Sequence, residues 1–406
     1  MSKVEELLAK YNPNGIDDIP LWELTAWDKR FNAVDKSMQK KVVKYKYYLA
    51  KDLDELVDDI GDIRILYTNE RVAYTSEEKC KDNVCEGEIV AIPWGGTPTV
   101  KYYKGKFVTG DNRIATSLDT NRLNNKYLYY WMISQLGIIS DYYRGAGIQH
   151  PSMLSVLSMQ IPLPHIKVQE EIVKILDSFT NLIDALNEEL SLRQKQFEYY
   201  REKLLTFDDE EPIIMNDIIH DLRTGLNPRT HFKLNTEDAN CYYVTVRELG
   251  LFDIVIDEKT DKVNRIAIDR INERSKIKNN DILFSGTGTI GRTALVKSEI
   301  YKWNIKEGVY VITPNILKVN PRYLIYLLHS LSLQKQYEIK AEGGAVKSVS
   351  MKEFKSLIVY IPPLSIQQSI VEKLDAFESL ISSLKEEIAL RQKQYEYYRE
   401  KLLTFE

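Results

Sequence analysis

Residues 191–207 read SLRQKQFEYYREKLLTF, and residues 389–405 read ALRQKQYEYYREKLLTF. The likeness extends over residues 164–207 and 362–405 without a gap, and 27 of the 44 aligned positions are identical. A repeat at one fixed offset, here 198 residues, indicates two copies of one structural unit. Each copy follows a longer segment in which the two halves are much less alike. The chain therefore alternates variable and constant segments. This organisation predicts that two different versions of one domain are held in one fixed geometry.

Length and composition indicate a globular protein with more than one core. The chain has 406 residues, of which 44% are hydrophobic and 28% are charged. No apolar run reaches membrane-spanning length and the N-terminus lacks a signal-peptide core, so we expect a cytoplasmic protein without a membrane segment. Cys80, Cys85 and Cys241 show no CxxC spacing, which fits a reducing compartment and argues against a zinc site.

The charge of the chain is balanced along its length. The formal net charge is −4, with 21 Lys and Arg against 22 Asp and Glu in residues 1–163, and 22 against 21 in residues 208–361. Taken alone, this balance argues against nucleic-acid binding, which usually leaves a basic footprint. A DNA-binding function would therefore need positive charge from another source.

The constant segments predict two long helices that pair. Apolar residues alternate in steps of four and three from Ile172 and from Ile370, which is a heptad pattern, and no Gly or Pro interrupts it. About 38 residues at ~1.5 Å each give helices roughly 55–60 Å long. Both directions of pairing are sterically open from the sequence alone. We expect an intramolecular antiparallel coiled coil, because that direction gives the two halves pseudo-twofold symmetry. Its predicted seam residues are Ile172, Leu176, Phe179, Ile183, Leu186, Leu190, Phe197, Leu204, Ile370, Leu374, Phe377, Ile381, Leu384, Ile388, Tyr395 and Leu402.

The two variable segments are predicted to share one fold, although their middle parts differ in sequence. Arg144-Gly145-Ala146-Gly147-Ile148-Gln149-His150 and Glu342-Gly343-Gly344-Ala345-Val346-Lys347-Ser348 stand at the same 198-residue offset, and each precedes a Ser-Met pair. Short apolar runs between turn residues, such as residues 89–93 and 281–284, predict β-rich middles. The predicted fold class is α/β (α+β), with two mixed β-rich globular domains joined by the long helices.

The predicted domain boundaries follow from the repeat. Val4 to Leu8 align with residues 201–205, which predicts a short N-terminal helix over residues 2–11. The predicted divisions are a first globular domain at 1–163, a central long helix at 164–207, a second globular domain at 208–361 and a C-terminal long helix at 362–406.

One glycine motif invites a different interpretation. Residues 286–291, Gly-Thr-Gly-Thr-Ile-Gly, match the dinucleotide-binding pattern, but the residues that follow predict a strand where that site requires a helix. A glycine-rich turn that approaches a ligand or a groove explains them better. The sequence has no Walker A, HExxH or GxSxG motif, and its five histidines lack metal-ligand spacing, so we predict no catalytic residue and no metal site.

These motifs resemble the DNA-specificity subunit of type I restriction–modification systems over essentially the whole chain. The resemblance rests on Pro-x-x-x-x-Gln-x-x-Ile-Val at Pro164 and Pro362, on the two RQKQ(F/Y)EYYREKLL ends, and on Asp281-Ile282-Leu283-Phe284 leading into Gly288-Thr289-Ile290-Gly291-Arg292. The first half departs from it, because residues 87–96 lack the Gly-Thr-Ile-Gly signature.

The resemblance implies a non-catalytic subunit that recognises double-stranded DNA. Each variable domain would be a target-recognition domain that reads one half of an asymmetric bipartite site, and the helix pair would set the spacer between the halves. The helices would also dock two methyltransferase (modification) subunits, which would bring S-adenosylmethionine, and restriction/translocase subunits would complete the complex. This chain would hold no cofactor. Partners that close around DNA would supply much of the phosphate contact, which would account for the balanced charge.

Candidate DNA-contacting residues lie beside glycine turns or in basic-aromatic loops, where side chains can reach base edges or phosphates. In the first domain they are Lys101, Tyr103, Lys104, Lys106, Arg144 and Gln149. In the second domain they are Arg223, Asn227, Arg229, Thr287, Arg292 and Lys347.

Two alternatives remain at this stage. The first is a coiled-coil scaffold or interaction protein without DNA specificity, which would not bind DNA even with a methyltransferase present. The second is an enzyme that binds a nucleotide at residues 286–291, and its nucleotide binding would depend on Gly288.

Overall fold

The chain forms two compact units. The computed structural model describes residues 2–80, 83–207, 211–250, 252–297, 302–344 and 346–405, without the side chains of residues 229 and 230. The first unit comprises Met1–Asn187 and Glu386–Glu406, and the second comprises Glu188–Lys385. Two long helices, α7 (Ile166–Leu205) and α13 (Leu364–Thr404), contribute residues to both units. The units thus divide inside the helices, whereas the four predicted domains follow the borders of the repeat.

A six-stranded sheet forms the centre of the first unit. Its strands follow the order β2 (Thr25–Trp27), β7 (Asn112–Ser117), β5 (Cys85–Pro93), β6 (Lys101–Thr109), β3 (Ile63–Leu66) and β4 (Val72–Thr75). Neighbouring strands are antiparallel except β3 and β6. Along β5, Val90 and Ile92 pack into one apolar cluster, while Ile89 and Ala91 pack into another. The alternation of a strand thus buries both faces of this sheet.

The other elements of the first unit surround this sheet. They are α1 (Lys3–Tyr11), β1 (Asp18–Pro20), α2 (Leu21–Leu24), η1 (Lys36–Met38), α3 (Glu77–Cys80), α4 (Asn125–Ser134), α5 (Leu136–Asp141), β8 (Tyr143–Arg144), β9 (His150–Pro151), α6 (Met153–Leu157) and β10 (Gln160–Pro162). Ser2 caps α1 through a reciprocal bond pair with Glu5, so the predicted N-terminal helix is present.

The described part of the second unit contains sheets of four, three and two strands. A four-stranded sheet has the order β12 (Ile219–Thr224), β18 (Val309–Pro314), β15 (Ile282–Ser285) and β16 (Thr293–Leu295). A three-stranded sheet has the order β14 (Lys262–Val263), β13 (Cys241–Val244) and β17 (Trp303–Ile305). Leu283 and Val311 of the first sheet share an apolar cluster with Val244 and Ile305 of the second. The two sheets therefore pack on one core.

The remaining elements of the second unit are short strands and helices. They are β11 (Ile213–Ile214), η2 (Met215–Asp217), α8 (Pro228–His231), η3 (Val246–Glu248), α9 (Arg265–Arg274), α10 (Pro321–Leu328), α11 (Leu331–Ile339), α12 (Met351–Lys355) and β19 (Ile358–Val359). The residues of 286–291 connect β15 to β16 as a turn, and β16 is a strand, as the sequence predicts.

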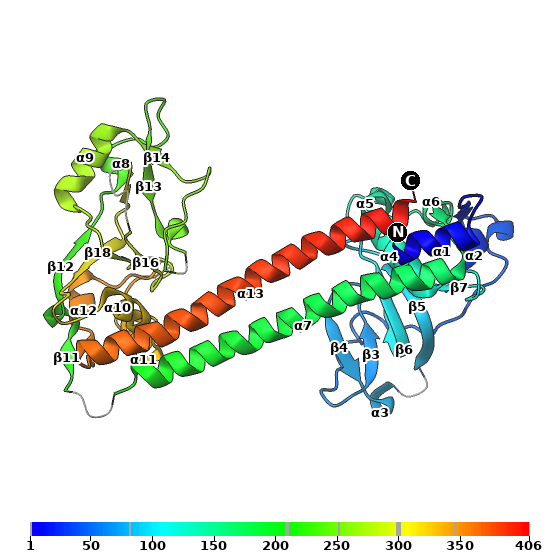
Figure 1. Cartoon of the computed structure of the whole chain (residues 1–406), viewed down its shortest axis with the longest axis horizontal. Coiled ribbons are helices and arrows are strands. Elements are labelled where there is room, and N and C mark those ends of the chain that lie inside the picture. The colour runs from blue at the N-terminus through cyan, green and yellow to red at the C-terminus, as the bar shows by residue number, and fades with distance from the viewer. Residues whose placement is uncertain are drawn as a thin grey trace. The chain divides into compact units, whose positions relative to one another are not determined.

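Within each unit, a part of α7 packs antiparallel to a part of α13 (Figure 1). In the first unit the ring of Phe179 stacks on Tyr398, with 5.4 Å between centroids. In the second unit Tyr200 stacks on Phe377 at 5.5 Å. These two pairs are the same pair under the 198-residue repeat, so the predicted antiparallel helix pairing is confirmed inside each unit.

The predicted seam residues face inward to different degrees. Those buried are Ile172, Leu176, Phe197, Ile370, Leu374, Ile381, Leu384 and Tyr395. Those partly buried are Phe179, Ile183, Leu186, Leu190, Leu204, Phe377, Ile388 and Leu402. Near the helix ends Leu205 and Leu403 are buried more completely than Leu204 and Leu402, because they pack into the apolar clusters of the two units.

A buried glutamine fixes α7 to the globular part of the first unit. The Gln169 side chain is fully buried, and its Oε1 accepts a hydrogen bond from the Asn124 N–H at 2.9 Å. Its Nε2 donates to the carbonyl oxygens of Arg122 at 2.9 Å and Pro164 at 2.8 Å. Asn124 in turn caps α4. One side chain therefore links the start of α7 to the start of α4.

The second unit repeats this arrangement with Gln367. Its Oε1 accepts from the Asn320 N–H at 2.8 Å, and its Nε2 donates to the carbonyls of Lys318 at 3.0 Å and Pro362 at 2.7 Å. Asn320 caps α10, the counterpart of α4. These bonds give the Pro-x-x-x-x-Gln motif of the sequence a structural role.

Replacing the buried glutamine should destabilise the fold. Gln169→Ala leaves one N–H and two carbonyl oxygens without their partner, so we expect a loss of about 2–4 kcal/mol in the free energy of unfolding. Urea unfolding followed by circular dichroism measures it. Gln392→Ala is the control, because Gln392 is exposed and its side chain bonds Glu396 on its own helix. Equal losses in the two variants would contradict the role given to Gln169.

A histidine in the second unit should make stability depend on pH. Burial, with a smaller contribution from the charge of Arg201, lowers the pKa of His329 to about 4. Its ring packs edge-on against Phe252, and its Nε2 lies 2.8 Å from Thr293 Oγ1. Below its ordinary pKa of about 6.5 the unfolded chain binds a proton that the folded chain does not. Stability is therefore lost as pH falls from 6.5 to 4, by about 3 kcal/mol at the lower limit.

The His329→Asn variant tests this pH dependence. Unfolding midpoints in urea between pH 4 and 6.5 should depend less on pH in this variant than in the unmodified chain. Burial raises the pKa of Glu378 to about 7, which acts in the opposite sense, so the difference between variant and parent is the informative quantity. His220→Asn, at an exposed position, should leave the dependence unchanged. Identical slopes for all three proteins would disprove the assignment.

Candidate nucleic-acid interface

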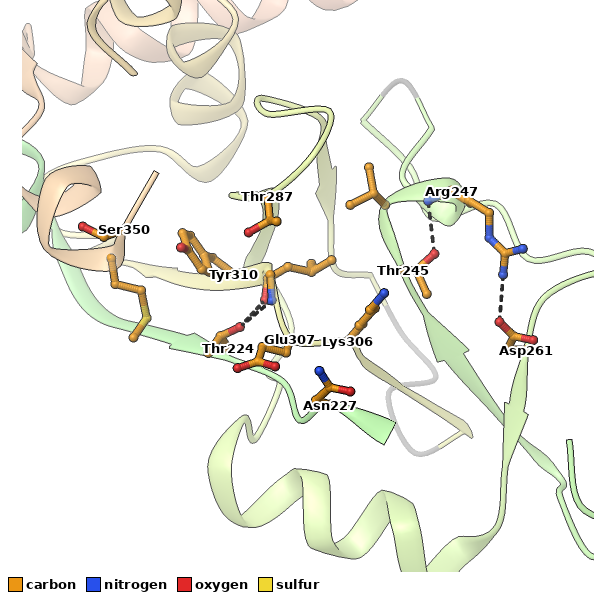
Figure 2. A pocket seen from close by; sticks show the side chains of 14 residues that line it. Thr224, Asn227, Thr245, Arg247, Asp261, Thr287, Lys306, Glu307, Tyr310 and Ser350 are labelled. Atoms are coloured by element: carbon orange, nitrogen blue, oxygen red, sulfur yellow. Dashed lines mark hydrogen bonds and ion pairs between the residues drawn. The ribbon is translucent and has the colours of Figure 1, made fainter. Parts of the chain in front are cut away.

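The second unit has a polar groove between its four-stranded and three-stranded sheets. The cavity measures about 790 Å³. Figure 2 shows the side chains of Lys306 and Asn227 between Thr224 on one side and Arg247 on the other. The lining residues are Thr224, Asn227, Thr245, Val246, Arg247, Asp261, Thr287, Lys306, Glu307, Gly308, Val309, Tyr310, Ser350 and Met351.

The cations of this groove are positioned but accessible. Thr245 and Glu248 form a capping box at η3, which holds the neighbouring Arg247 at the rim. The Arg247 guanidinium pairs with Asp261 at 3.0 Å and remains 61% exposed. Lys306 is exposed in the turn between β17 and β18. Exposed cations beside hydroxyl and amide groups are the set that contacts phosphates and base edges.

Close backbone approaches shape the floor of the groove. Thr224 Oγ1 donates to the Val309 carbonyl at 3.0 Å and accepts from the Gly308 N–H at 3.2 Å. The Gly286 N–H donates to the Gly308 carbonyl at 2.8 Å. A Cβ atom at Gly286 would lie 2.3 Å from the ring of Tyr310, so only glycine fits. The turn at residues 286–291 thus serves to pack this wall of the groove.

The first unit has a basic-aromatic cleft of about 330 Å³ beside strands β3 and β6. The guanidinium of Arg64 lies over the ring of Tyr74 at 5.3 Å, and that of Arg71 lies over Tyr67 at 4.9 Å. Burial, with a smaller contribution from Arg64, lowers the pKa of Lys101 to about 8. Cations interleaved with aromatic rings suit the backbone and bases of nucleic acids.

The predicted residues of the first domain occupy three places. Lys101 and Tyr103 line the cleft, and Lys101 Nζ donates to the Tyr67 carbonyl. Lys104 and Lys106 do not line it; they pair with Glu88 and Glu77 respectively. Arg144, at the end of β8, and Gln149, in the loop that joins β8 to β9, are exposed. The structure therefore brings together only part of the predicted set.

The predicted residues of the second domain are also divided. Asn227 and Thr287 line the groove, while Arg292 and Lys347 are exposed in the loops beside it. Arg292 Nη1 donates to the Val246 carbonyl at 3.3 Å, which places it near the rim. Arg229 lies in α8, but its side chain is outside the described residues.

Arg223 lies inside the second unit, away from the groove lining. It pairs with the buried carboxylate of Asp281 at 2.9 Å and donates to Thr313 Oγ1 at 2.8 Å. Burial raises the pKa of Asp281, and the bond from Thr313 opposes that rise. This arrangement gives Arg223 a structural role, since it neutralises a carboxylate that the fold has buried.

Four basic residues of these sites were absent from the sequence prediction. Arg64 and Arg71 line the cleft, and Arg247 and Lys306 line the groove. The Thr-x-x-Glu capping pattern around Arg247 was a visible signal of an ordered turn there. The cleft had no comparable signal, because β3 and β6 are about 40 residues apart and pair as parallel strands.

The helices carry a second, duplicated surface. Leu192 and Leu390 are each 58% exposed, and Tyr199 and Tyr397 are each 59% exposed. Each pair stands seven residues apart, so Leu and Tyr lie on one face of their helix. We call these the Leu-Tyr patches. The chain therefore presents the same exposed Leu and Tyr pair at both copies of the repeat.

Other classes of site find little support in the described parts of the chain. No group of three or more His, Cys, Asp or Glu side chains there could hold a metal ion. No helix among these residues is both long and apolar enough to cross a bilayer. The turn at residues 286–291 leads into the antiparallel strand β16, so it lacks the helix that a dinucleotide site requires.

Comparison with known proteins gives one consistent result. The family described as the type I restriction modification DNA specificity domain matches residues 28–192 and 225–390. A putative type I restriction enzyme specificity subunit of Haemophilus influenzae is 31% identical over 380 residues, covering 87% of this chain and 95% of that protein. A type I restriction enzyme specificity subunit of Escherichia coli is 29% identical, covering 100% and 97%.

Solved structures show the same fold. The S subunit of a type I restriction–modification system from M. genitalium superposes with a TM-score of 0.61, at 15% identity and 96% coverage of both chains. The family match covers both halves of the repeat, and the predicted resemblance is confirmed, whereas a scaffold without DNA specificity is not favoured. The chain therefore belongs to the type I restriction–modification DNA specificity family.

Proposed function

We propose that each unit of this DNA-specificity subunit reads one half of an asymmetric, two-part DNA sequence. The observation that carries the proposal is the contrast between the two units. They attach to the helices through the same bonds of Gln169 and Gln367, yet one presents a cleft of Arg and Tyr and the other a polar groove. Different surfaces on a common attachment suit two different half-sites. The helices α7 and α13, which contribute to both units, would set the spacer between them.

The balanced charge supports a shared interface with DNA. Many of the basic side chains are already paired, for example Arg247 with Asp261 and Lys106 with Glu77. Phosphate contacts supply most of the affinity of DNA-binding proteins, whereas contacts to base edges supply specificity. This chain would supply base readout, and partner subunits would supply much of the phosphate contact.

The Leu-Tyr patches support two copies of one partner. We propose that each patch docks one methyltransferase subunit, and that these subunits hold S-adenosylmethionine and perform the methylation. Restriction/translocase subunits would complete the complex. The present chain would position the DNA and take no part in the chemistry.

Methylation mapping of residue variants tests the reading of half-sites. In a host that carries the chain with its methyltransferase, we expect one asymmetric two-part methylated sequence. Arg64→Ala should lower the discrimination between bases at one position of one half-site by about tenfold, because it removes one contact. Lys306→Ala should do the same in the other half-site. Lys104→Ala is the control, since Lys104 lies outside the cleft lining. A variant that changed both halves alike would refute the division.

The stoichiometry of the complex tests the docking surface. Tyr199→Ala and Tyr397→Ala should each reduce bound methyltransferase from two copies to one, and the double variant should bind none, because each removes one apolar contact centre. Mass photometry of the purified complex measures the ratio. Leu317→Ala, which changes another exposed apolar residue, should keep both copies. Two copies on the double variant would rule the patches out.

A further inference from the structure

A pair of loops is built alike in both units, although the surrounding sheets differ. In the first unit Arg144 bridges His150 across a glycine loop, and the Gly96 N–H donates to the Gln149 carbonyl at 3.3 Å. The donor Gly96 belongs to the turn after β5. We call residues 145–149 of the first unit, and residues 343, 344, 346 and 347 of the second, the glycine loops; Ala345 lies outside the described residues.

The second unit forms equivalent bonds, with the loop residues 198 positions later and the donor glycine 192 positions later. Glu342 bridges Ser348, and the Gly288 N–H donates to the Lys347 carbonyl at 2.9 Å. The donor now comes from the turn after β15. The first half therefore has a counterpart of this turn even though its sequence lacks the Gly-Thr-Ile-Gly signature.

Both glycine loops start with a glycine in a similar backbone conformation. Gly145 has φ +146° and Gly343 has φ +122°, a backbone conformation that favours glycine. A Cβ atom at Gly145 would lie 2.7 Å from the Ile148 carbonyl oxygen, and at Gly343 it would lie 2.3 Å from that of Val346. The fold itself therefore requires these two glycines.

A second glycine in each loop has no such requirement. At Gly147 and Gly344 an added Cβ would meet no atom within 4 Å, and neither residue has a φ in the left-handed range. Glycine in an exposed loop costs conformational entropy on folding. Since packing inside the chain does not explain these glycines, close approach of something outside it does.

Each loop also exposes an aliphatic side chain at the same position. Ile148 is 70% exposed and Val346 is 60% exposed. The Ile148 side chain lies directly over Gly95, where a Cβ would come within 2.8 Å of its Cγ2. The second loop also adjoins the polar groove, because Thr287, a lining residue, bridges Ser348.

We propose that the two glycine loops are the DNA contact common to both units, with Ile148 and Val346 laid against the sugars and base edges of a groove. The proposal rests on the proposed function, in which the two units read different sequences. Both loops share the same bridge, the same glycine donor bond and an exposed aliphatic side chain at the same position, so we assign them a contact to what all DNA shares. Small residues let the backbone approach the groove, and an exposed aliphatic side chain can lie between or beside base steps.

A bulky residue at Gly147 separates this contact from a folding role. Gly147→Leu should leave the thermal midpoint unchanged, because the added side chain enters open space. In the complex with methyltransferase, it should raise the dissociation constant about tenfold, for target and unrelated duplexes alike. Gly137→Leu is the matched control, since a Cβ there also meets nothing, and it should change neither affinity. Fluorescence anisotropy with labelled duplexes measures both constants.

Removing the exposed side chains provides a second measurement. Ile148→Ser and Val346→Ser should each weaken binding to both duplexes by roughly threefold to tenfold, through lost apolar contact. Ile60→Ser and Leu317→Ser, at other exposed aliphatic positions of the two units, should not. Methylation mapping should return the original sequence for every variant.

Three results would overturn the proposal. They are unchanged affinity in the loop variants, a changed methylated half-site, or loss of a methyltransferase copy by mass photometry, which would make the loops a protein contact. A wild-type complex without target preference would count against the proposed function itself. The loops would then be judged on unrelated DNA alone, which the same titrations measure.

Discussion

The buried amides of Gln169 and Gln367 are the constraint on which the architecture depends. Each amide satisfies one N–H and two carbonyl groups that the fold has removed from water. An unsatisfied buried group costs about 1–3 kcal/mol, so the start of each long helix can take few other positions relative to the domain beside it. Tyr130 and Tyr326 add a second bond of the same kind, to Asp177 and Asp375. The orientation of each domain on its helix is therefore set by hydrogen bonds, and apolar packing fills the space between.

This local attachment allows the rest of each domain to vary. The first unit builds a six-stranded sheet and the second builds sheets of four and three strands, yet both begin α4 or α10 with an asparagine held by the glutamine. Surfaces that read DNA can thus change without disturbing the helices. The two kinds of exposed surface differ in the same respect. The Leu-Tyr patches are duplicated almost without change, whereas the residues that line the cleft differ from those that line the groove.

The electrostatics follow from this division. Arg113 and Asp28 form a fully buried pair, and Arg223 neutralises Asp281, so part of the basic content serves the interior. The basic side chains of such buried pairs support the fold and are not accessible to a DNA phosphate. Some of the accessible cations, such as Arg247 and Lys106, are paired with carboxylates, which is consistent with a subunit that contributes recognition to an assembly in which others supply charge.

Local sequence patterns were sufficient for the helices, the N-terminal helix and the turn at residues 286–291, whereas the antiparallel pairing was inferred from the symmetry of the repeat. Heptads, caps and glycine turns act over a few residues, so they can be recognised without tertiary information, and the exact repeat then related the two halves. The environment of single side chains was a different matter. Arg223, a predicted DNA contact, pairs with the buried Asp281. Arg64, Arg71, Arg247 and Lys306 line the two sites without having been predicted. Which face of a strand is buried, and which distant strand lies beside it, depends on contacts between residues far apart in the chain; the parallel pairing of β3 with β6 is one such contact. Only the folded arrangement brings those residues together, and for that reason it alone distinguishes an arginine that supports the core from one that faces a groove.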